Sequence, residues 1–164
     1  MLAGQSLSSW NGFDHPMKAL IVYVSVEHGN TEKVAKAMAE AIGAEAKKAE
    51  DVDPNTISEY DIIGFGSGIF HGKFHPALLQ LVDDLPQLKA RAFIISTGGK
   101  GDQKQHPQLK ERLQSKGLEV LEGFSCKAWD TYGPFKLTGG INKGRPNEED
   151  LKKAREFAEA LPRS

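Results

Sequence analysis

One stretch constrains this chain most: an apolar segment that runs directly into a polar, glycine-containing loop and then into a helical pattern. The apolar segment covers residues 19–24, the loop runs from Ser25 to Thr31 (SVEHGNT), and the helical pattern starts near Glu32. A buried strand followed by such a turn presents the free N–H groups of the first helical turn, where the helix dipole favours a bound anion. Because the loop contains no Lys or Arg, we expect it to hold a phosphate monoester through amides and hydroxyls.

Within this loop Ser25, Asn30 and Thr31 supply neutral hydrogen-bond donors, and Gly29 supplies a positive φ or a close backbone approach. The candidate binding set also includes the loop residues Glu27 and His28. The alternative interpretation is a polar turn without a ligand. A nucleoside triphosphate P-loop is not supported, since G-x-x-x-x-G-K-[ST] does not occur. A dinucleotide site is not supported either, because G-x-G-x-x-G does not follow the strand.

Composition narrows the class of protein. The 164 residues fit one domain, and 39% hydrophobic with 26% charged residues is ordinary for a globular chain. The net charge of −1 gives no electrostatic case for nucleic-acid binding. No apolar run is long enough to span a membrane, and no secretory signal is visible. The lone cysteine, Cys126, suits a reducing compartment, so we expect a cytoplasmic protein.

The first 16 residues differ from the rest of the chain. Residues 1–16 are rich in Ser, Gly and Asn, lack periodicity, and precede a second methionine, Met17. We interpret them as a mobile N-terminal extension, followed by a single domain over residues 17–164.

Hydrophobic periodicity predicts an alternation of strands and helices. Strands are expected over residues 18–24, 44–49, 60–66, 90–96 and 118–128, and helices over 31–42, 76–85, 107–116 and 148–161, with turns and a short helix over 51–59. Such alternation implies parallel strands joined by right-handed crossovers. The fold class is therefore α/β: a doubly wound, five-stranded parallel sheet of order 2-1-3-4-5 with helices on both faces.

Three polar, glycine-bearing loops follow the central strands of this sheet. They are Ser25–Thr31, Ser67–His75 and Thr97–His106. Because the carboxyl ends of parallel strands meet at one edge, beside the topological switch point, we expect these loops to form one ligand site.

The first loop and the strand before it resemble the flavodoxin family, whose loop of the type S/T-x-x-G-N-T follows a Tyr-ending strand and takes the phosphate of FMN. Here Tyr23, Ser25, Gly29, Asn30 and Thr31 match that pattern in type and order. Three residues stand between Ser25 and Gly29, where the family has two. The resemblance covers Met17 to about Leu161 and implies a noncovalently bound FMN.

In that family the second loop grips one face of the flavin ring. The resemblance makes the whole run Ser67, Gly68, Ile69, Phe70, His71, Gly72 and Lys73 a candidate. Ile69 or Phe70 would lie against the ring. Only glycine makes peptide rotation inexpensive, so we hypothesise that the His71–Gly72 peptide turns its carbonyl toward the N5 proton of reduced flavin. The alternative is a simple turn, with Phe70 and Phe74 in the core.

The third loop resembles the one that binds the pyrimidine edge of the flavin through backbone N–H groups. Its candidate residues are Thr97, Gly98, Gly99 and Asp102. No aromatic residue occurs from Thr97 to His106. The outer ring face is then open to substrate, or is covered by the long connection over residues 129–135, with Trp129 and Tyr132 as candidates. An ordinary surface loop that buries Trp129 is the alternative.

Charge near the expected ring bears on its redox potential. The second and third loops carry Lys73, Lys100 and Lys104 against Asp102 alone. Each nearby cation favours the anionic reduced flavin by roughly 1 kcal/mol at intermediate dielectric. We therefore expect a milder potential than a low-potential carrier needs.

Two functions follow from the resemblance. One is electron transfer to or from a redox partner protein. The other is an NAD(P)H or quinone reductase with a small-molecule donor or acceptor, favoured by the near-neutral charge and the missing aromatic residue. As a minor option, Ile69, Gly72, Phe74 and His75 also resemble the matching loop of menaquinone-dependent protoporphyrinogen dehydrogenase. A regulatory domain that has lost FMN is a weaker third class.

Two histidines and the cysteine are not expected to have a chemical role. We expect no metal site from His71 and His75, and Cys126 is expected to be inert core. The sequence leaves the oligomeric state open.

Overall fold

A computed structural model covers the chain and describes residues 10–11, 13–14, 17–26, 28–129 and 139–162. Its main sheet has the order β4-β3-β5-β7-β8, with β9 also paired to β7 and β6 paired to β5. The strands are β3 (Ala19–Val24), β4 (Glu45–Lys48), β5 (Ile62–Phe70), β6 (Lys73–Phe74), β7 (Arg91–Gly98), β8 (Glu119–Val120) and β9 (Phe124–Lys127). All pairs are parallel except β5 with β6. Counting β8 and β9 as one fifth strand gives the predicted order 2-1-3-4-5.

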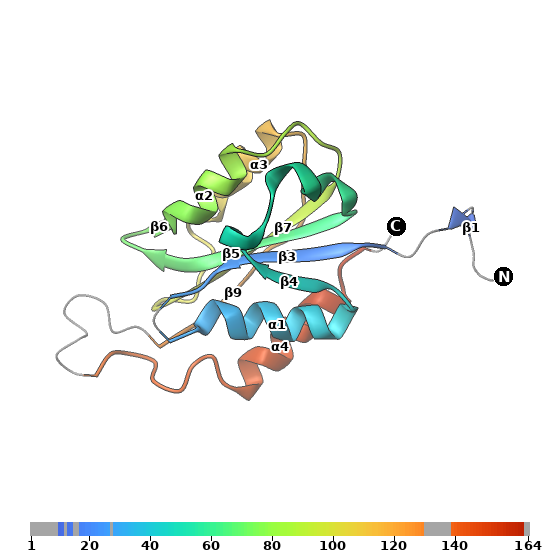
Figure 1. Cartoon of the computed structure of the whole chain (residues 1–164). Coiled ribbons are helices and arrows are strands. Elements are labelled where there is room, and N and C mark those ends of the chain that lie inside the picture. The colour runs from blue at the N-terminus through green and yellow to red at the C-terminus, as the bar shows by residue number, and fades with distance from the viewer. Residues whose placement is uncertain (1–9, 12, 15–16, 27, 130–138, 163–164) are drawn as a thin grey trace.

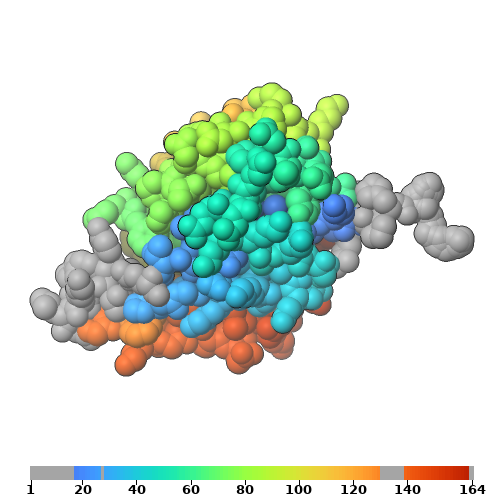
Figure 2. Space-filling model, in the orientation of Figure 1, coloured from blue at the N-terminus to red at the C-terminus, as the bar shows by residue number. Residues whose placement is uncertain are grey.

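Helices cover both faces of this sheet, as predicted. Helices α2 (Pro76–Asp83) and α3 (His106–Ser115) lie on one face, and α1 (Asn30–Ile42) and α4 (Glu148–Glu159) lie on the other (Figure 1). The space-filling view shows the green surface of α2 on one side of the molecule, opposite the pale blue of α1 and the red of α4 (Figure 2). Two 3₁₀ helices, Ala49–Asp51 and Pro54–Glu59, occupy the predicted turn region.

Side chains of the central strands point alternately into two hydrophobic cores, one on each face of the sheet. Leu20, Val22, Ile63 and Phe65 pack under α2 and α3, whereas Ile21 and its same-face neighbours pack against α1 and α4. Both faces of β3 are buried, which is why its sequence reads as a continuous apolar run.

Predicted helix ends are confirmed at two positions. Gly43 caps α1 in the left-handed conformation (φ 67°). Asn147 caps α4 through a capping box, in which its side chain accepts from the N–H of Asp150 while the Asp150 carboxylate accepts from the N–H of Asn147.

Two boundary predictions are wrong. The fifth strand is split into two strands with residues 121–123 between them, and in this break Gly123 packs closely on His106, where a Cβ would stand 2.6 Å from Nδ1. The second loop is shorter than expected, because β5 continues to Phe70 and pairs with β6. Within residues 1–16, β1 (Trp10–Asn11) and β2 (Phe13–Asp14) form a separate two-stranded antiparallel sheet. The domain boundary at residue 17 stays a prediction.

Candidate functional site

The first loop ends in an open helix N-terminus. Gly29 stands at the N-cap of α1 with φ 68° and has no side chain with which to cap the helix. The hydroxyl of Ser25 accepts a hydrogen bond from the N–H of Glu32 at 3.1 Å. The N–H groups of Asn30 and Thr31 have no acceptor within the helix, since they belong to its first turn. Glu27 lies outside the described residues.

Behind this turn, buried side chains join the first loop to its neighbours. The hydroxyls of Thr31 and Thr97 lie 2.9 Å apart, and both residues are almost fully buried. Asn30 donates from Nδ2 to the carbonyl of Trp129 at 2.9 Å, while its buried Oδ1 has no partner among the described residues. The structure thus brings the predicted first and third loops into direct contact.

These residues open onto a space that we call the narrow cleft, of about 410 Å³ including open solvent. It is lined by Asn30, Thr31, Gly68, Ile69, Phe70, Thr97, Gly98 and Trp129, with Val26 and Ala128 at its margin. The ring of Phe70 packs over Gly68, where a Cβ would stand 3.1 Å from Phe70 Cζ. Five predicted residues from the second and third loops therefore lie beside the first loop.

The second loop is a hairpin turn. His71 (φ 51°) and Gly72 (φ 72°) connect β5 to β6 in two residues, as a type I′ turn requires. Ser67 is fully buried: its hydroxyl donates to the carbonyl of Gly68 at 2.7 Å and accepts from the N–H of His75 at 3.1 Å. Ser67 therefore ties the hairpin base together. Lys73 is exposed on β6.

Phe74 is buried in the core, as the alternative interpretation expected. His75 caps α2, because its Nδ1 accepts from the N–H of Ala77 at 3.0 Å. Neither Phe74 nor His75 lines the narrow cleft, whereas Phe70, which the alternative also placed in the core, is half-buried and lines it.

A second space lies between the hairpin and the third loop, and we call it the wide hollow. It measures about 900 Å³ including open solvent and is lined by Ile69, Gly72, Ser96, Gly98, Gly99, Lys100, Gly101, Asp102, Gln105 and Ile141. It shares Ile69 and Gly98 with the narrow cleft, so the two spaces adjoin along the edge of the sheet. The Asp102 carboxylate accepts from the N–H of Lys104 at 3.2 Å.

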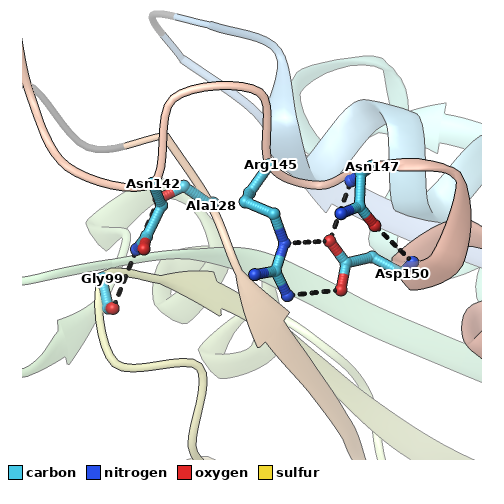
Figure 3. A network of polar contacts seen from close by, with 6 residues as sticks. All are labelled: Gly99, Ala128, Asn142, Arg145, Asn147 and Asp150. Atoms are coloured by element: carbon cyan, nitrogen blue, oxygen red, sulfur yellow. Dashed lines mark hydrogen bonds and ion pairs between the residues drawn. The ribbon is translucent and has the colours of Figure 1, made fainter.

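Sequence reasoning missed Ile141, which comes from the segment before α4. Its neighbour Asn142 holds this segment in place: Asn142 Nδ2 donates to the carbonyl of Gly99 at 2.9 Å and to that of Ala128 at 3.3 Å (Figure 3). Ile141 follows two glycines and belongs to no periodic pattern, so the sequence carries no signal for it.

Trp129 lies at the narrow cleft, away from the lining of the wide hollow. Its ring stacks on His28 with centroids 3.7 Å apart and planes at 13°. Its Nε1 donates to the carbonyl of Gly139 at 2.9 Å, and Lys143 Nζ lies 5.7 Å from its ring centroid. Trp129 thus packs against the first loop. Tyr132, the other residue expected to cover the ring face, lies outside the described residues.

Beneath the wide hollow, Ser96 and His106 form a buried pair. Ser96 Oγ and His106 Nε2 lie 2.8 Å apart. Burial lowers the pKa of His106 to about 4, so its imidazole is neutral at pH 7. Burial also raises the pKa of the Cys126 thiol to about 12, which keeps it protonated. This state agrees with its expected place in the core.

The described residues also bear on two other features, a metal centre and a membrane-spanning helix. They contain no group of three or more His, Cys, Asp or Glu side chains placed to hold a metal ion. None of the helices in this part of the chain has the length and apolar character needed to cross a membrane.

Comparison with known proteins gives a consistent family. Residues 20–130 match the family model described as a flavodoxin domain. The chain is 48% identical over 147 residues to an uncharacterized protein of Methanocaldococcus jannaschii, covering 88% of this chain and 98% of the relative.

Solved structures agree on the fold. Flavodoxin 2 of Bacillus cereus superposes with a TM-score of 0.65 at 21% identity, covering 86% of this chain and 94% of that chain. Rubredoxin oxygen:oxidoreductase of Desulfovibrio gigas gives a TM-score of 0.60 at 18% identity, over 88% of this chain and 35% of the larger protein. The structures show the fold, and the match of residues 20–130 to the family model shows that the chain belongs to the flavodoxin family.

Proposed function

We propose that this protein binds one FMN noncovalently and transfers electrons through it, with a redox partner protein as donor or acceptor. The observation that carries the proposal is the open N-terminus of α1 at the narrow cleft, which adjoins the wide hollow. The phosphate of FMN would bind at the N-terminus of α1, and its flavin ring would lie between the hairpin and the third loop. We expect such a protein to work in the cytoplasm.

The residues present fit this cofactor. The first turn of α1 offers neutral N–H donors to a phosphate, and a Cβ on Gly29 would meet nothing within 4 Å, so the approach is open. The Oδ1 of Asn30, which has no partner within the described part of the chain, can accept a hydrogen bond from a hydroxyl of the ribityl chain. Buried polar atoms normally have partners, so this orphaned oxygen favours a ligand in the cleft.

At the wide hollow, the apolar side chains of Ile69 and Ile141 and the backbone of Gly98 and Gly99 would hold the ring. When bound, FMN supplies the one- and two-electron redox chemistry. The protein supplies binding, orientation and charge: Lys100 stands at the hollow, and Gly72 occupies the turn that we expect to reorient.

A flavin-dependent reductase acting on NAD(P)H, a quinone or another small molecule is the second candidate. It is favoured by the lining of the wide hollow, which includes no aromatic residue among the described positions. An uncovered ring face would admit a small substrate. The resemblance of one loop to protoporphyrinogen dehydrogenase makes that activity a minor variant of this candidate.

Two glycines allow a matched test of the phosphate site. Gly29 and Gly43 cap opposite ends of α1 with φ 68° and 67°, and an added methyl meets nothing at either position. Both alanine variants therefore carry a similar backbone cost of about 1–2 kcal/mol. We expect Gly29→Ala to weaken FMN binding at least about tenfold in a fluorescence titration, because the methyl obstructs the anion's approach. Gly43→Ala should bind FMN like the unmodified protein.

The two candidate functions separate in an anaerobic titration of the FMN-loaded protein with NADPH. Bleaching of the flavin without an added reductase supports the small-molecule reductase. An oxidised spectrum that persists until a reductase protein is added supports the electron carrier. Absence of FMN binding would contradict both.

A further inference from the structure

A third depression lies beside the wide hollow, between the end of β9 and the first turns of α4. We call it the basic pocket; it is lined by Gly101, Ser125, Lys127, Arg145, Asp150 and Lys153. Gly101 also lines the wide hollow, so one residue separates the two spaces. A Cβ on Gly101 (φ 63°) would stand 2.7 Å from the backbone nitrogen of Lys127, which shows how closely the third loop packs on β9.

Hydrogen bonds to Asp150 hold the guanidinium of Arg145 in place and leave its Nη1 to contact a ligand. Its Nε and Nη2 donate to the two carboxylate oxygens of Asp150 (Figure 3). Asp150 is 4% exposed and also accepts from the N–H of Asn147, so both of its carboxylate oxygens already have hydrogen-bond donors. Nη1 takes no part in this fork. A pre-positioned guanidinium nitrogen is suited to a carboxylate or phosphate oxygen.

Two lysines add further positive charge at the surface of the pocket. Lys127 and Lys153 are exposed and form no ion pair within the described part of the chain. The pocket therefore has three cations, Lys127, Arg145 and Lys153, against the single carboxylate of Asp150. The thiol of Cys126 adds no negative charge, because burial keeps it protonated.

We infer that the basic pocket binds the phosphate or carboxylate group of a small-molecule electron donor or acceptor whose reactive part lies in the wide hollow. This inference rests on the proposed FMN binding, because the adjoining hollow must hold the ring, and on the second candidate function, the small-molecule reductase. The arrangement uses Arg145 for orientation and the two lysines for charge, next to the space where electrons would pass.

The test uses the FMN-saturated protein, so that the phosphate site of the cofactor is filled. Backbone amides and the Nε–H of Arg145 are followed by NMR during separate titrations with inorganic pyrophosphate and succinate. We expect saturable shifts at Lys127 and Arg145 with at least one of the two anions. The stronger binder identifies phosphate or carboxylate as the recognised group.

The matched variants keep the overall charge change equal. Lys127→Gln with Lys153→Gln removes two cations from the pocket, while Lys89→Gln with Lys152→Gln removes two exposed cations outside it. Arg145 is left intact, since its removal would strand the buried Asp150. We expect about tenfold weaker anion binding in the first double variant and little change in the second.

Two results would overturn the inference: no saturable shift with either anion, or equal weakening in both double variants. FMN titration of the same samples separates this outcome from a failure of the proposed function. Protein that binds FMN but neither anion contradicts only the basic pocket. Protein that binds no FMN contradicts the flavin function itself.

Discussion

The hydroxyls that join the walls of the narrow cleft lie buried on regular elements, whereas several residues that line the wide hollow lie exposed on turns. Thr31 and Thr97 belong to α1 and β7 and are bonded to each other in the interior. Gly72 and Lys100 stand in turn or loop positions at the surface. The first arrangement suits tight, rigid binding of a phosphate, and the second suits adjustment of a ring whose charge changes.

The largest effect is expected at the Ser96–His106 pair under the wide hollow, because His106 is titratable. The pKa of His106 is lowered from its ordinary 6.5 to about 4 by burial, so between these pH values only the unfolded chain binds the proton. Stability from this group is therefore complete above pH 6.5 and is lost as the pH falls toward 4, by about 3 kcal/mol. Denaturant unfolding between pH 7 and pH 4 measures this loss.

His106→Gln keeps a polar partner near Ser96 and removes the titration. We expect its unfolding free energy to fall less over the same pH range. An identical pH profile for the variant and the unmodified protein would show that acid sensitivity comes from other groups.

The second-largest effect is expected at the narrow cleft. Thr31→Val keeps the shape of the side chain and strands the hydroxyl of Thr97, which is 3% exposed. The loss should be about 1–3 kcal/mol in unfolding free energy, accompanied by weaker FMN binding in a fluorescence titration. Thr31→Ser keeps the hydroxyl and should lose less. A larger loss in Thr31→Ser than in Thr31→Val would mean that packing of the methyl group, not the hydrogen bond, matters here.

At the wide hollow, Gly72→Ala should change redox behaviour more than stability. With φ 72° at Gly72, alanine costs about 1–2 kcal/mol of backbone strain, while the nearest atom to its methyl is 4.0 Å away. If the His71–Gly72 peptide reorients on reduction, the flavin potentials must shift. Gly144→Ala is the control, because Gly144 has φ 88° and open space outside the site. Unaltered potentials in Gly72→Ala would exclude the reorientation.

The same contrast explains what the sequence could predict. The narrow cleft follows from a contiguous motif, an apolar strand, a glycine turn and a helix start, so Gly29 and Asn30 could be placed in advance. The helix caps Gly43 and Asn147 could likewise be predicted from the sequence. Local chemistry determines each of these features.

The rest depends on long-range contacts. The turn-forming residues around His71 predict a loop, yet pairing of Ile69 with Phe74 extends the strand. Thr97 reaches Thr31 because the two elements meet across 66 residues of sequence. Ile141 reaches the wide hollow because Asn142 is anchored to Gly99. Tertiary structure alone specifies these contacts.

The smallest expected effect tests whether charge tunes the wide hollow. Lys100→Gln removes a cation from its lining, which should lower the flavin's reduction potential by less than about 1 kcal/mol of free energy, since the lysine is exposed and screened. Spectroelectrochemical titration at low and high salt measures the shift, with Lys89→Gln as a control outside the site. Because salt weakens exposed charge interactions, the shift should shrink as ionic strength rises. A potential that Lys100→Gln leaves unchanged at low salt would remove the electrostatic argument for a mild potential and favour the low-potential carrier.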